Sequence, residues 1–452
     1  MNTVFAFLFA LAILVIVHEL GHYWVARWCG VKVLRFSVGF GKPLLIKRVG
    51  VDQTEWVLSL IPLGGYVKML DEREIEINDA PIPPEELPRA FNRQPVAKRI
   101  AIVVAGPLAN FLLALLFYAA INWIGFKAPE ARIAAPIEQS QFARQVDAEK
   151  MTGATVQSIN GRAVRSWDDV QAGLAEAAAD QIDASMVLLT PQQQTITVVL
   201  QTGGVTLDED QPDSATQLGL RLAQEAPLIG MVVKESPAQA CGLQAGDRVV
   251  RVNGAAIDSA TQLLQQIKSA AGQALEFELL RDQKLATCRV TPLAQTDAAG
   301  KSVGKIGATI ASQYHLVQIR YGIGGSILQA GKQLQHMTWF SLRMLWKVVT
   351  GKRSLKDLSG PLTIADYAGK TAEMGWVPYV NFLALISLSL GVLNLLPVPL
   401  LDGGHLLYYL AEIMLGRELS PRVQEMGQRI GLGLLLLLMS VALFNDIVRL
   451  TH

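Results

Sequence analysis

The sequence has little charge and little cysteine for its length. Only 17% of its 452 residues are charged, whereas soluble globular domains usually carry about 25%, and 51% are hydrophobic. This balance argues against an ordinary water-soluble chain and favours a membrane protein. Three cysteines, Cys29, Cys241 and Cys288, form no regularly spaced framework, so no disulfide scaffold is predicted. The formal net charge of +1 gives no reason to expect nucleic-acid binding.

Four stretches of the chain are long and apolar enough to cross a bilayer, which needs roughly 20 residues. The N-terminus lacks the basic leader and the small-residue cleavage site of a signal peptide, so we interpret its apolar run as a retained first span. The four spans are predicted at residues 2–25, 100–126, 376–401 and 430–450.

Lysine and arginine gather in two of the connections between these spans. Six of them, and no acidic residue, lie between Leu20 and Val51, and Arg417, Arg422 and Arg429 lie between the third and fourth spans. Cytoplasmic connections collect Lys and Arg near span ends, so both should face the cytoplasm. Both termini and the long middle segment are then predicted on the outer side.

The middle segment reads as soluble and contains an internal near-repeat. In each copy an alternating strand meets an Asn-Gly turn, at Asn160-Gly161 and at Asn253-Gly254, and such turns suit residues with positive φ. A Ser or Thr then precedes a helical pattern, at 168–178 and at 261–271, and another strand follows. The repeat predicts two copies of one small α+β module.

The first apolar span ends in the motif His18-Glu19-Leu20-Gly21-His22. On a helix, positions four residues apart share a face, so both imidazoles can reach one metal ion, and Glu19 can act as a base toward water. A charged side chain in a span costs about 2.5–3.5 kcal/mol on insertion scales, so such residues are rarely kept for packing. The alternative is a pair of histidines that only form hydrogen bonds at the end of the helix and bind no metal.

A catalytic zinc site needs a third protein ligand and an open position. Asp402 is the candidate, although Asp-Gly-Gly after prolines can also be a turn with Asp402 as a helix N-cap. The first and third spans run in the same direction, so their C-terminal ends lie at the same depth. His18, His22 and Asp402 are therefore predicted to meet near the cytoplasmic face.

Two distant motifs together resemble the site-2 protease family of intramembrane metalloproteases. They are HExxH in the first span and NxxPxPxxDG from Asn394 to Gly403. The resemblance extends over the whole chain and includes Gly39-Phe40-Gly41, residues 62–68 and residues 106–110. The repeated modules resemble bacterial PDZ domains, the second more than the first, which has Gly153-Ala154 in place of the usual Gly-Asp pair.

This resemblance implies one Zn²⁺ per chain, held by His18, His22 and Asp402, with Glu19 as general base. It also implies that residues of the third span and of the first cytoplasmic loop bind substrate: Asn394, Pro397, Pro399, Gly64, Gly65 and Tyr66. Strands at 33–47 and 56–68 would pair with an unwound substrate segment, although a purely structural hairpin is the alternative. For Asn394 the alternative is a hydrogen bond between spans.

The implied fold is a polytopic α-helical membrane protein with four transmembrane helices, two tandem periplasmic PDZ (α+β) domains and a small membrane-associated β region. In chain order the predicted segments are a first span (1–30), a cytoplasmic-side β-hairpin region (31–99), a second span (100–126), PDZ domains (128–222 and 223–310), amphipathic linker helices (311–375), a third span (376–402), a cytoplasmic loop (403–429) and a fourth span (430–450).

The resemblance further implies a multi-pass protein of the Gram-negative inner membrane. Its substrates would be single-span membrane proteins, such as an anti-sigma factor already cut on the outer side, and also remnant signal peptides. The PDZ modules would bind peptide C-termini, or they would act as spacers or as a steric guard over the active site. The linker helices would lie on the surface of the lipid bilayer, or they would pack in the protein core. A non-catalytic PDZ scaffold and a metal transporter or sensor are the alternatives in other functional classes.

Overall fold

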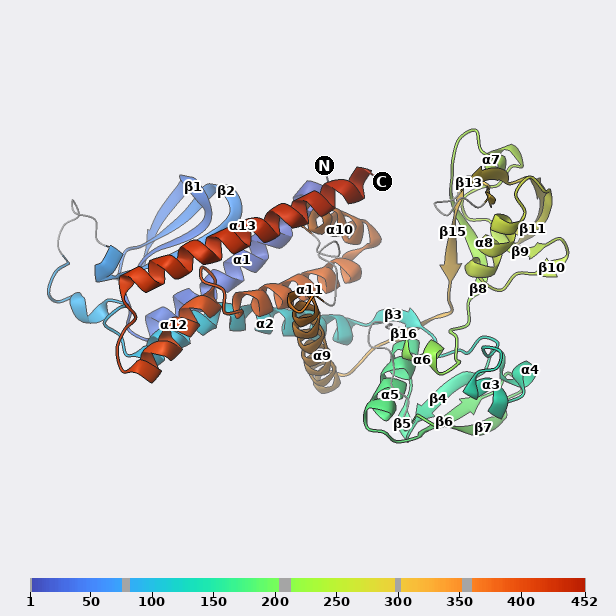
Figure 1. Cartoon of the computed structure of the whole chain (residues 1–452), viewed down its shortest axis with the longest axis horizontal. Helices are drawn as coiled ribbons and strands as arrows, with labels where there is room; N and C mark the ends of the chain where they lie inside the picture. The colour runs from blue at the N-terminus through green and yellow to red at the C-terminus, as the bar shows by residue number, and fades with distance from the viewer. Residues whose placement is uncertain (1, 75–81, 203–212, 297–301, 352–359, 452) are drawn as a thin grey trace. The chain divides into compact units, whose positions relative to one another are not determined.

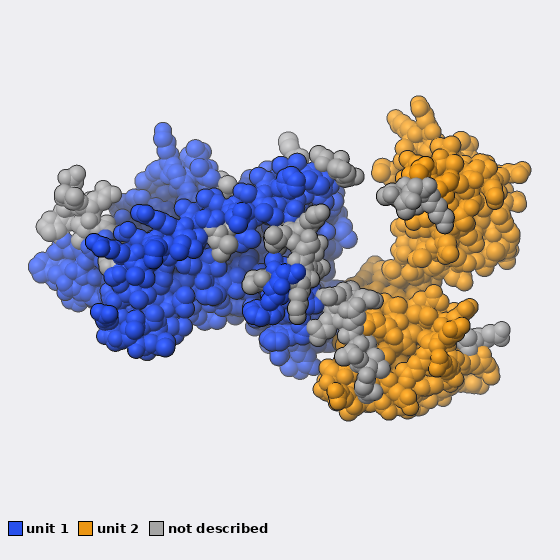
Figure 2. All heavy atoms as spheres, viewed as in Figure 1, with its two compact units in different colours: residues 1–126, 320–452 blue, residues 127–319 orange. Residues whose placement is uncertain are grey.

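The computed structural model describes residues 2–74, 82–202, 213–296, 302–351 and 360–451 (Figure 1). The chain divides into two compact units (Figure 2). Unit 1 combines residues 1–126 with residues 320–452, and unit 2 is the segment between them. The predicted hairpin region, PDZ domains and linker each contain a stretch, at 75–81, 203–212, 297–301 and 352–359, that lies outside the described residues.

Among its described residues, unit 1 contains four helices that are long and apolar enough to span a membrane. They are α1 (Asn2–Trp28), α2 (Val96–Ile124), α11 (Trp376–Asn394) and α13 (Pro421–Thr451). This number agrees with the four predicted spans. Three shorter or amphipathic helices accompany them: α9 (Ile323–Val349), α10 (Pro361–Met374) and α12 (Asp402–Leu415).

Several predicted boundaries were wrong. The third span was predicted to run to 401 or 402, but α11 ends at Asn394, since Pro397 and Pro399 have no N–H to continue a helix. The second ends at Ile124, where Gly125 turns with φ 100°, and the fourth begins at Pro421 rather than 430 because its helix extends beyond the apolar run. The predicted cytoplasmic loop at 403–429 is largely helical.

The segment after the first helix forms the two strands expected there, β1 (Val33–Val49) and β2 (Thr54–Met69). Both strands bend, so that Arg35 pairs with Glu55 on one side and with Lys68 on the other. Residues 33–38 therefore lie between 54–59 and 65–69, and 43–49 pairs with the outer side of 54–59. As a result, residues 65–69 form one edge of this small antiparallel sheet.

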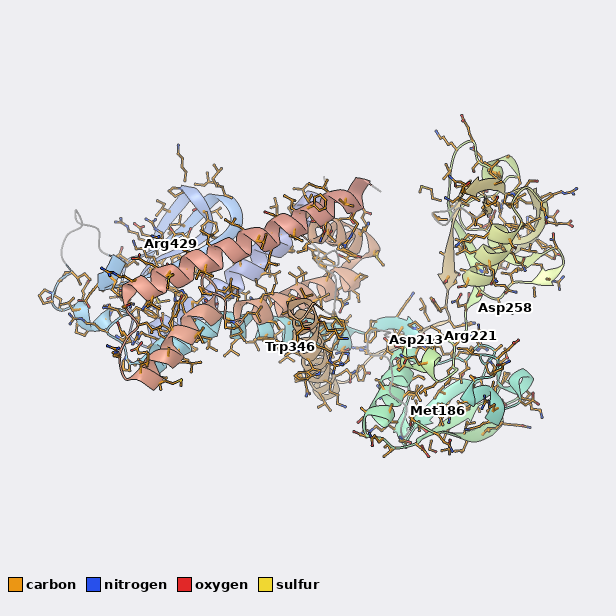
Figure 3. All side chains as sticks on the ribbon, in the orientation of Figure 1. Met186, Asp213, Arg221, Asp258, Trp346 and Arg429 are labelled. Atoms are coloured by element: carbon orange, nitrogen blue, oxygen red, sulfur yellow. A yellow bond between two sulfur atoms is a disulfide. The ribbon has the colours of Figure 1, made fainter. Side chains whose placement is uncertain are left out.

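The first module of unit 2 has the sheet order β5-β4-β6-β7, with helix α5 (Trp167–Ala179) between its strand pairs. Its strands are β4 (Thr155–Ile159), β5 (Arg162–Ala163), β6 (Ala184–Leu189) and β7 (Thr195–Leu200). The predicted turn has positive φ at Asn160, and Ser166 caps the helix. Met186 is fully buried in the core of this module (Figure 3).

The second module repeats this arrangement and adds two strands. Its order is β12-β11-β9-β8-β15, with the short β10 paired to β9 and with α8 (Ala260–Ser269) as its helix. The strands are β8 (Glu225–Val232), β9 (Arg248–Val252), β10 (Ala255–Ala256), β11 (Leu275–Arg281), β12 (Lys284–Val290) and β15 (Ala308–Gln313). Asn253 has the positive φ predicted from the repeat. The predicted end of this module at 310 was therefore wrong, because β15 continues the sheet to Gln313.

A disulfide joins Cys241 to Cys288 within the second module. Cys241 follows the short helix α7 (Pro237–Ala240), and Cys288 lies on β12. No disulfide framework was predicted from the sequence, and this single bridge was missed, since a separation of 47 residues carries no spacing signal. Cys29 is a free thiol at the end of α1.

The predicted linker at 311–375 is helical only in part of its described residues. Its first residues complete β15 and form β16 (Leu316–Ile319), which pairs with β3 (Phe126–Pro129). Helix α9 packs along α2 and leaves Trp339 and Trp346 exposed. Trp346 is labelled on this helix in Figure 3.

Candidate metal centre

Three side chains from two helices converge in unit 1. His18 and His22 lie one turn apart on α1, and Asp402 is the first residue of α12. Asp402 Oδ2 lies 3.2 Å from His18 Nε2 and 3.5 Å from His22 Nε2, and the two Nε2 atoms are 3.3 Å apart. The structure thus brings together the three residues that the two motifs singled out.

This cluster has the properties of a metal site. Oδ2 of Asp402 is buried and makes no hydrogen bond to any described residue, and two imidazole nitrogens point toward it. A buried carboxylate oxygen without a partner is costly, and a cation at the point of convergence would relieve that cost. Two histidines and one carboxylate are a known ligand set of catalytic zinc, and they leave a fourth position open.

The Nδ1 atoms of both imidazoles face helix α2. His22 Nδ1 lies 2.8 Å from the carbonyl oxygen of Ile102, to which it can donate, and His18 Nδ1 lies 3.1 Å from Nδ2 of the Asn110 side-chain amide. A histidine that donates from Nδ1 presents an unprotonated Nε2, which is the form that binds metal. Asn110 and the backbone of Ile102 therefore orient the candidate ligands.

Helices α1 and α2 approach closely at two glycines. A β-carbon on Gly106 would lie 2.2 Å from His22 Nε2, and one on Gly21 would lie 2.3 Å from the carbonyl oxygen of Ala105. Only glycine fits at either position without displacing its neighbours. Gly106 and Asn110 belong to the motifs that carry the family resemblance, but neither was predicted as a site residue. A polar residue in the uncharged second span was the signal for Asn110.

Asp402 is not the helix cap of the alternative interpretation. The N-cap of α12 is Leu401, whose side chain makes no capping hydrogen bond. The chain reaches Asp402 through a non-helical segment in which Leu400 has φ 96°. Glycines follow at once: a β-carbon on Gly403 would lie 2.1 Å from the carbonyl oxygen of Leu396. The carboxylate is thereby free to face the histidines.

Of the three predicted substrate-binding residues in and after the third span, only Asn394 borders the metal centre in the structure. Asn394 Nδ2 lies 3.3 Å from His18 Nε2, so its amide borders the metal centre. Pro397 is exposed. Pro399 packs between two glycines, since a β-carbon on Gly404 would lie 2.7 Å from its Cα and one on Gly431 would lie 2.1 Å from its carbonyl oxygen.

The hairpin residues lie beside the general-base candidate. A β-carbon on Gly65 would lie 3.0 Å from Cγ of Glu19 and 2.9 Å from Cγ1 of Val15. Glu19 itself is buried, with 9% of its surface exposed. The sheet edge therefore lies against α1 at Glu19 through Gly65, its first residue. This approach depends on the absence of a side chain at Gly65.

The two neighbours of Gly65 pack within the sheet. Gly64 faces the ring of Phe40, which also stacks on Tyr66 with centroids 6.3 Å apart. Tyr66 accepts a hydrogen bond of 3.4 Å from Arg35. These contacts join the two loop motifs noted in the sequence and fix the shape of the edge.

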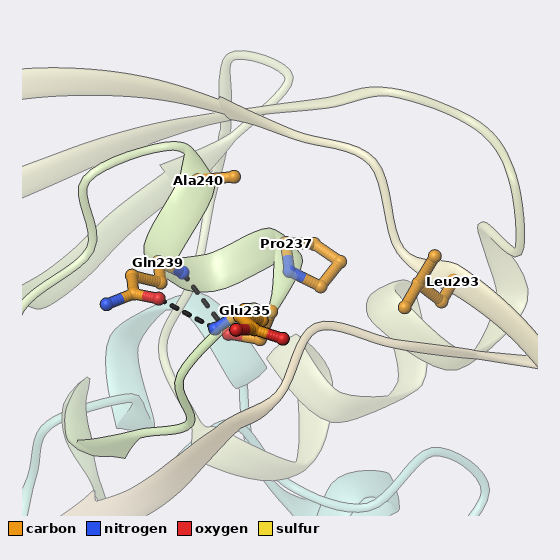
Figure 4. Close-up of a pocket in the computed structure, with 6 residues that line it drawn as sticks. Glu235, Pro237, Gln239, Ala240 and Leu293 are labelled. Carbon is orange, nitrogen blue, oxygen red and sulfur yellow. Dashed lines mark hydrogen bonds between the residues drawn. The ribbon is translucent and has the colours of Figure 1, made fainter.

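A separate pocket lies on the second module of unit 2 (Figure 4). Its floor is ordinary helix-capping structure: Ser236 accepts from the backbone of Gln239, whose side chain accepts from the backbone of Glu235. The pocket is lined by Glu235, Ser236, Pro237, Gln239, Ala240 and Leu293. It offers one carboxylate, and the hydroxyl of Ser236 is engaged, since it also donates to the carbonyl oxygen of Val233 at 2.6 Å.

Comparison with known proteins agrees with the geometry. The sequence pattern described as "Peptidase family M50" matches residues 6–438. The "Putative zinc metalloprotease RSc1411" of Ralstonia nicotianae is 45% identical over 460 residues, which cover 100% of this chain and 99% of that protein. The "Regulator of sigma-E protease RseP" of Escherichia coli is 38% identical over 454 residues, which cover 98% of each.

Among solved structures, the PDZ domain of an SdrC-like protein from Listeria monocytogenes is 23% identical. The match covers 19% of this chain and 88% of that domain, with a TM-score of 0.17. That score is too low to support a conclusion about the fold.

Proposed function

The chain belongs to peptidase family M50 and is a bacterial zinc metalloendopeptidase of the site-2 protease kind, and we propose that it cleaves single-span membrane proteins within the lipid bilayer. The observation that carries this proposal is the convergence of His18 and His22, on the membrane-length helix α1, with Asp402, the first residue of α12. A site built on such helices would lie within the lipid bilayer, which water-soluble proteases cannot enter.

We assign one zinc ion to His18, His22 and Asp402. When bound, zinc supplies Lewis acidity, which polarises a peptide carbonyl and lowers the pKa of water. Glu19, next to His18 on the same helix, takes the proton of the attacking water and passes it to the leaving amine. The amide of Asn394, at the border of the site, donates to the carbonyl oxygen or the substrate backbone.

The small sheet presents the substrate. A transmembrane helix hides its peptide bonds in internal hydrogen bonds, so it must unwind before it can be cut. The edge at residues 65–69 can replace those bonds by adding the substrate as another strand. Its position over Glu19 supports this role for Gly64, Gly65 and Tyr66.

We place the metal centre near the cytoplasmic face, with both termini and unit 2 in the periplasm. Lys and Arg in the connections on either side of the site support this orientation. The disulfide between Cys241 and Cys288 supports it independently, because structural disulfides persist in oxidising compartments.

The two modules of unit 2 act as PDZ domains, and α9 lies on the membrane surface. The strand, Asn-Gly turn and helix that both modules share support their assignment as PDZ domains. The exposed Trp339 and Trp346 support the position of α9 on the membrane surface. Since relatives are named for regulation of sigma-E, the substrate class includes an anti-sigma factor already shortened on the outer side. Remnant signal peptides are a second substrate of the same single-span form.

The test is co-expression with a single-span reporter protein, together with the zinc content of the purified enzyme. Asp402→Asn should lose zinc and cleavage together. Asp366→Asn, which changes an Asp paired with Lys370 on α10, should retain both. If the protein were a non-catalytic scaffold, both variants would still bind the reporter but neither would cut it. Retention of zinc by Asp402→Asn would refute the ligand set.

A further inference from the structure

One face of α2 contacts the elements that supply the proposed ligands. Ile102 and Asn110 bond to the histidines of α1, and the carbonyl oxygen of Asn110 also accepts from Ser387 of α11. One turn before Ile102 on the same face is Arg99, whose side chain is 5% exposed. The proposed chemistry gives no role to this buried cation.

Arg99 bonds to the far part of α12. Its Nη2 donates to Oε1 of Glu412 at 2.6 Å, and its guanidinium lies 5.0 Å from the ring centroid of Tyr409. Nη1 lies 3.4 Å from the carboxylate of Glu418, beyond the end of the helix. Its Nε donates to the carbonyl oxygen of Gln94, so the cation is also tied to the start of its own helix.

The direction of α12 decides where Asp402 lies. Of the other helices and strands, α12 packs mainly against α2, and the segment before it is non-helical. Asp402 and Glu412 are ten residues apart, which is about 15 Å along a helix. A tilt of about 4° about the Glu412 end would move Asp402 by about 1 Å. Zinc ligation tolerates errors of only about 0.2 Å.

We propose that Arg99 is a positioning residue, whose ion pair with Glu412 sets the tilt of α12 and so holds Asp402 at the metal. This inference rests on the proposed ligand set. A buried ion pair is weak evidence for stability, because desolvation offsets its attraction, but it can select one geometry of packed elements. Arg99 and Glu412 select the geometry in which the carboxylate reaches both histidines.

The test measures metal binding by the full-length protein in detergent, by competition with a chelator. Arg99→Met should weaken zinc binding by about 10- to 100-fold, the usual effect of losing a group that orients a ligand. The d–d absorption of the cobalt-substituted protein should change as well, because that spectrum reports ligand geometry. The matched control is Lys98→Met, which removes an exposed cation from the same turn of α2.

Two further variants keep the test decisive. Glu412→Gln disturbs the fold less and should give a smaller change of the same kind, and the exchange Arg99→Glu with Glu412→Arg should restore most of the affinity. If Arg99→Met and Glu412→Gln both keep wild-type affinity and spectrum, the positioning role is refuted. If Asp402→Asn also keeps its zinc, the proposed ligand set fails first; if it loses zinc, only the role of Arg99 fails.

Discussion

The side-chain amide of Asn110 lies 3.1 Å from Nδ1 of His18, and both groups are buried between α1 and α2. The amide oxygen Oδ1 has no hydrogen-bond partner among the described residues. A half-turn of the amide would bring Oδ1 to Nδ1, where it would accept the Nδ1 proton. His18 would then present an unprotonated Nε2 to the metal, as His22 does through Ile102.

Replacement of Asn110 by leucine, which has a similar shape, should therefore weaken zinc binding by about 10- to 100-fold. The expected cause is free rotation and the wrong tautomer of His18. Zinc affinity of the purified protein measures the effect. Asn122→Leu is the matched control, since Asn122 is also buried on α2 but its Nδ2 has no hydrogen-bond partner among the described residues. Equal losses in the two variants would contradict the orienting role.

Glu19→Gln should retain zinc and lose activity. Glutamine has nearly the same shape but cannot take a proton from water, and a positioned general base contributes about 10²- to 10⁴-fold to the rate. Metal analysis and cleavage of a single-span reporter should be measured on one preparation. Loss of zinc along with activity would instead make Glu19 part of the metal site.

The sequence was sufficient to single out the three proposed ligands, which the structure brings together, because their signals are local or topological. His18 and His22 are spaced for one helix face, and the apolar spans bring Asp402 to the same depth. The partners of those ligands are contacts between distant segments, such as the carbonyl of Ile102 or Arg99 with Glu412, 313 residues apart. No spacing rule predicts such pairs.

The same difference between local signals and contacts of distant segments explains which parts of the fold were predicted incorrectly. The apolar run alone extended the third span past Asn394, although two prolines in it forbid a continuous helix. The predicted strands at 33–47 and 56–68 are present, but the bend that places Arg35 between two parts of β2 depends on tertiary packing. The Asn-Gly turns were predictable because a two-residue turn fixes its own backbone.

Gly65→Ala should reduce cleavage sharply while leaving zinc binding intact. The added methyl would lie 2.7 Å from the carbonyl oxygen of Ser37 and 3.0 Å from Cγ of Glu19, so the sheet edge must move away from α1. A misplacement of about 1 Å can cost about 10²-fold in rate. The control is Gly324→Ala on α9, where a β-carbon meets nothing within 4 Å. Unchanged cleavage by Gly65→Ala would contradict a substrate-presenting edge.

Acid should loosen the second module of unit 2 in a way that depends on Arg281. Burial opposes ionisation of Asp247, but hydrogen bonds from Arg281 and from the backbone of Gln244 outweigh it and lower the pKa of Asp247 below 3.8. Because the folded-state pKa is depressed, the carboxylate stabilises the fold above the unfolded value and ceases to do so as pH falls through the folded value.

Arg281→Met should raise the pKa of Asp247 and shift this loss of stability to higher pH. Susceptibility of the full-length protein to pepsin, scored by cuts within residues 225–313, measures the shift. Arg289→Met removes an exposed cation from the neighbouring strand β12 and should leave the profile unchanged. Identical acid profiles for wild type and Arg281→Met would show that the ion pair does not control the module.

Cysteine labelling should show which side of the membrane each unit faces. Cys29 is a free thiol at the end of α1, the helix that carries both histidines, and it should react with an impermeant maleimide in inverted membrane vesicles but not in spheroplasts. A cysteine introduced by Arg417→Cys, just after α12, should behave in the same way. Cys241 and Cys288 should react only after reduction, and from the opposite side. Labelling of Cys29 and position 417 from opposite faces would separate the histidines from Asp402, and one metal ion could not bind all three.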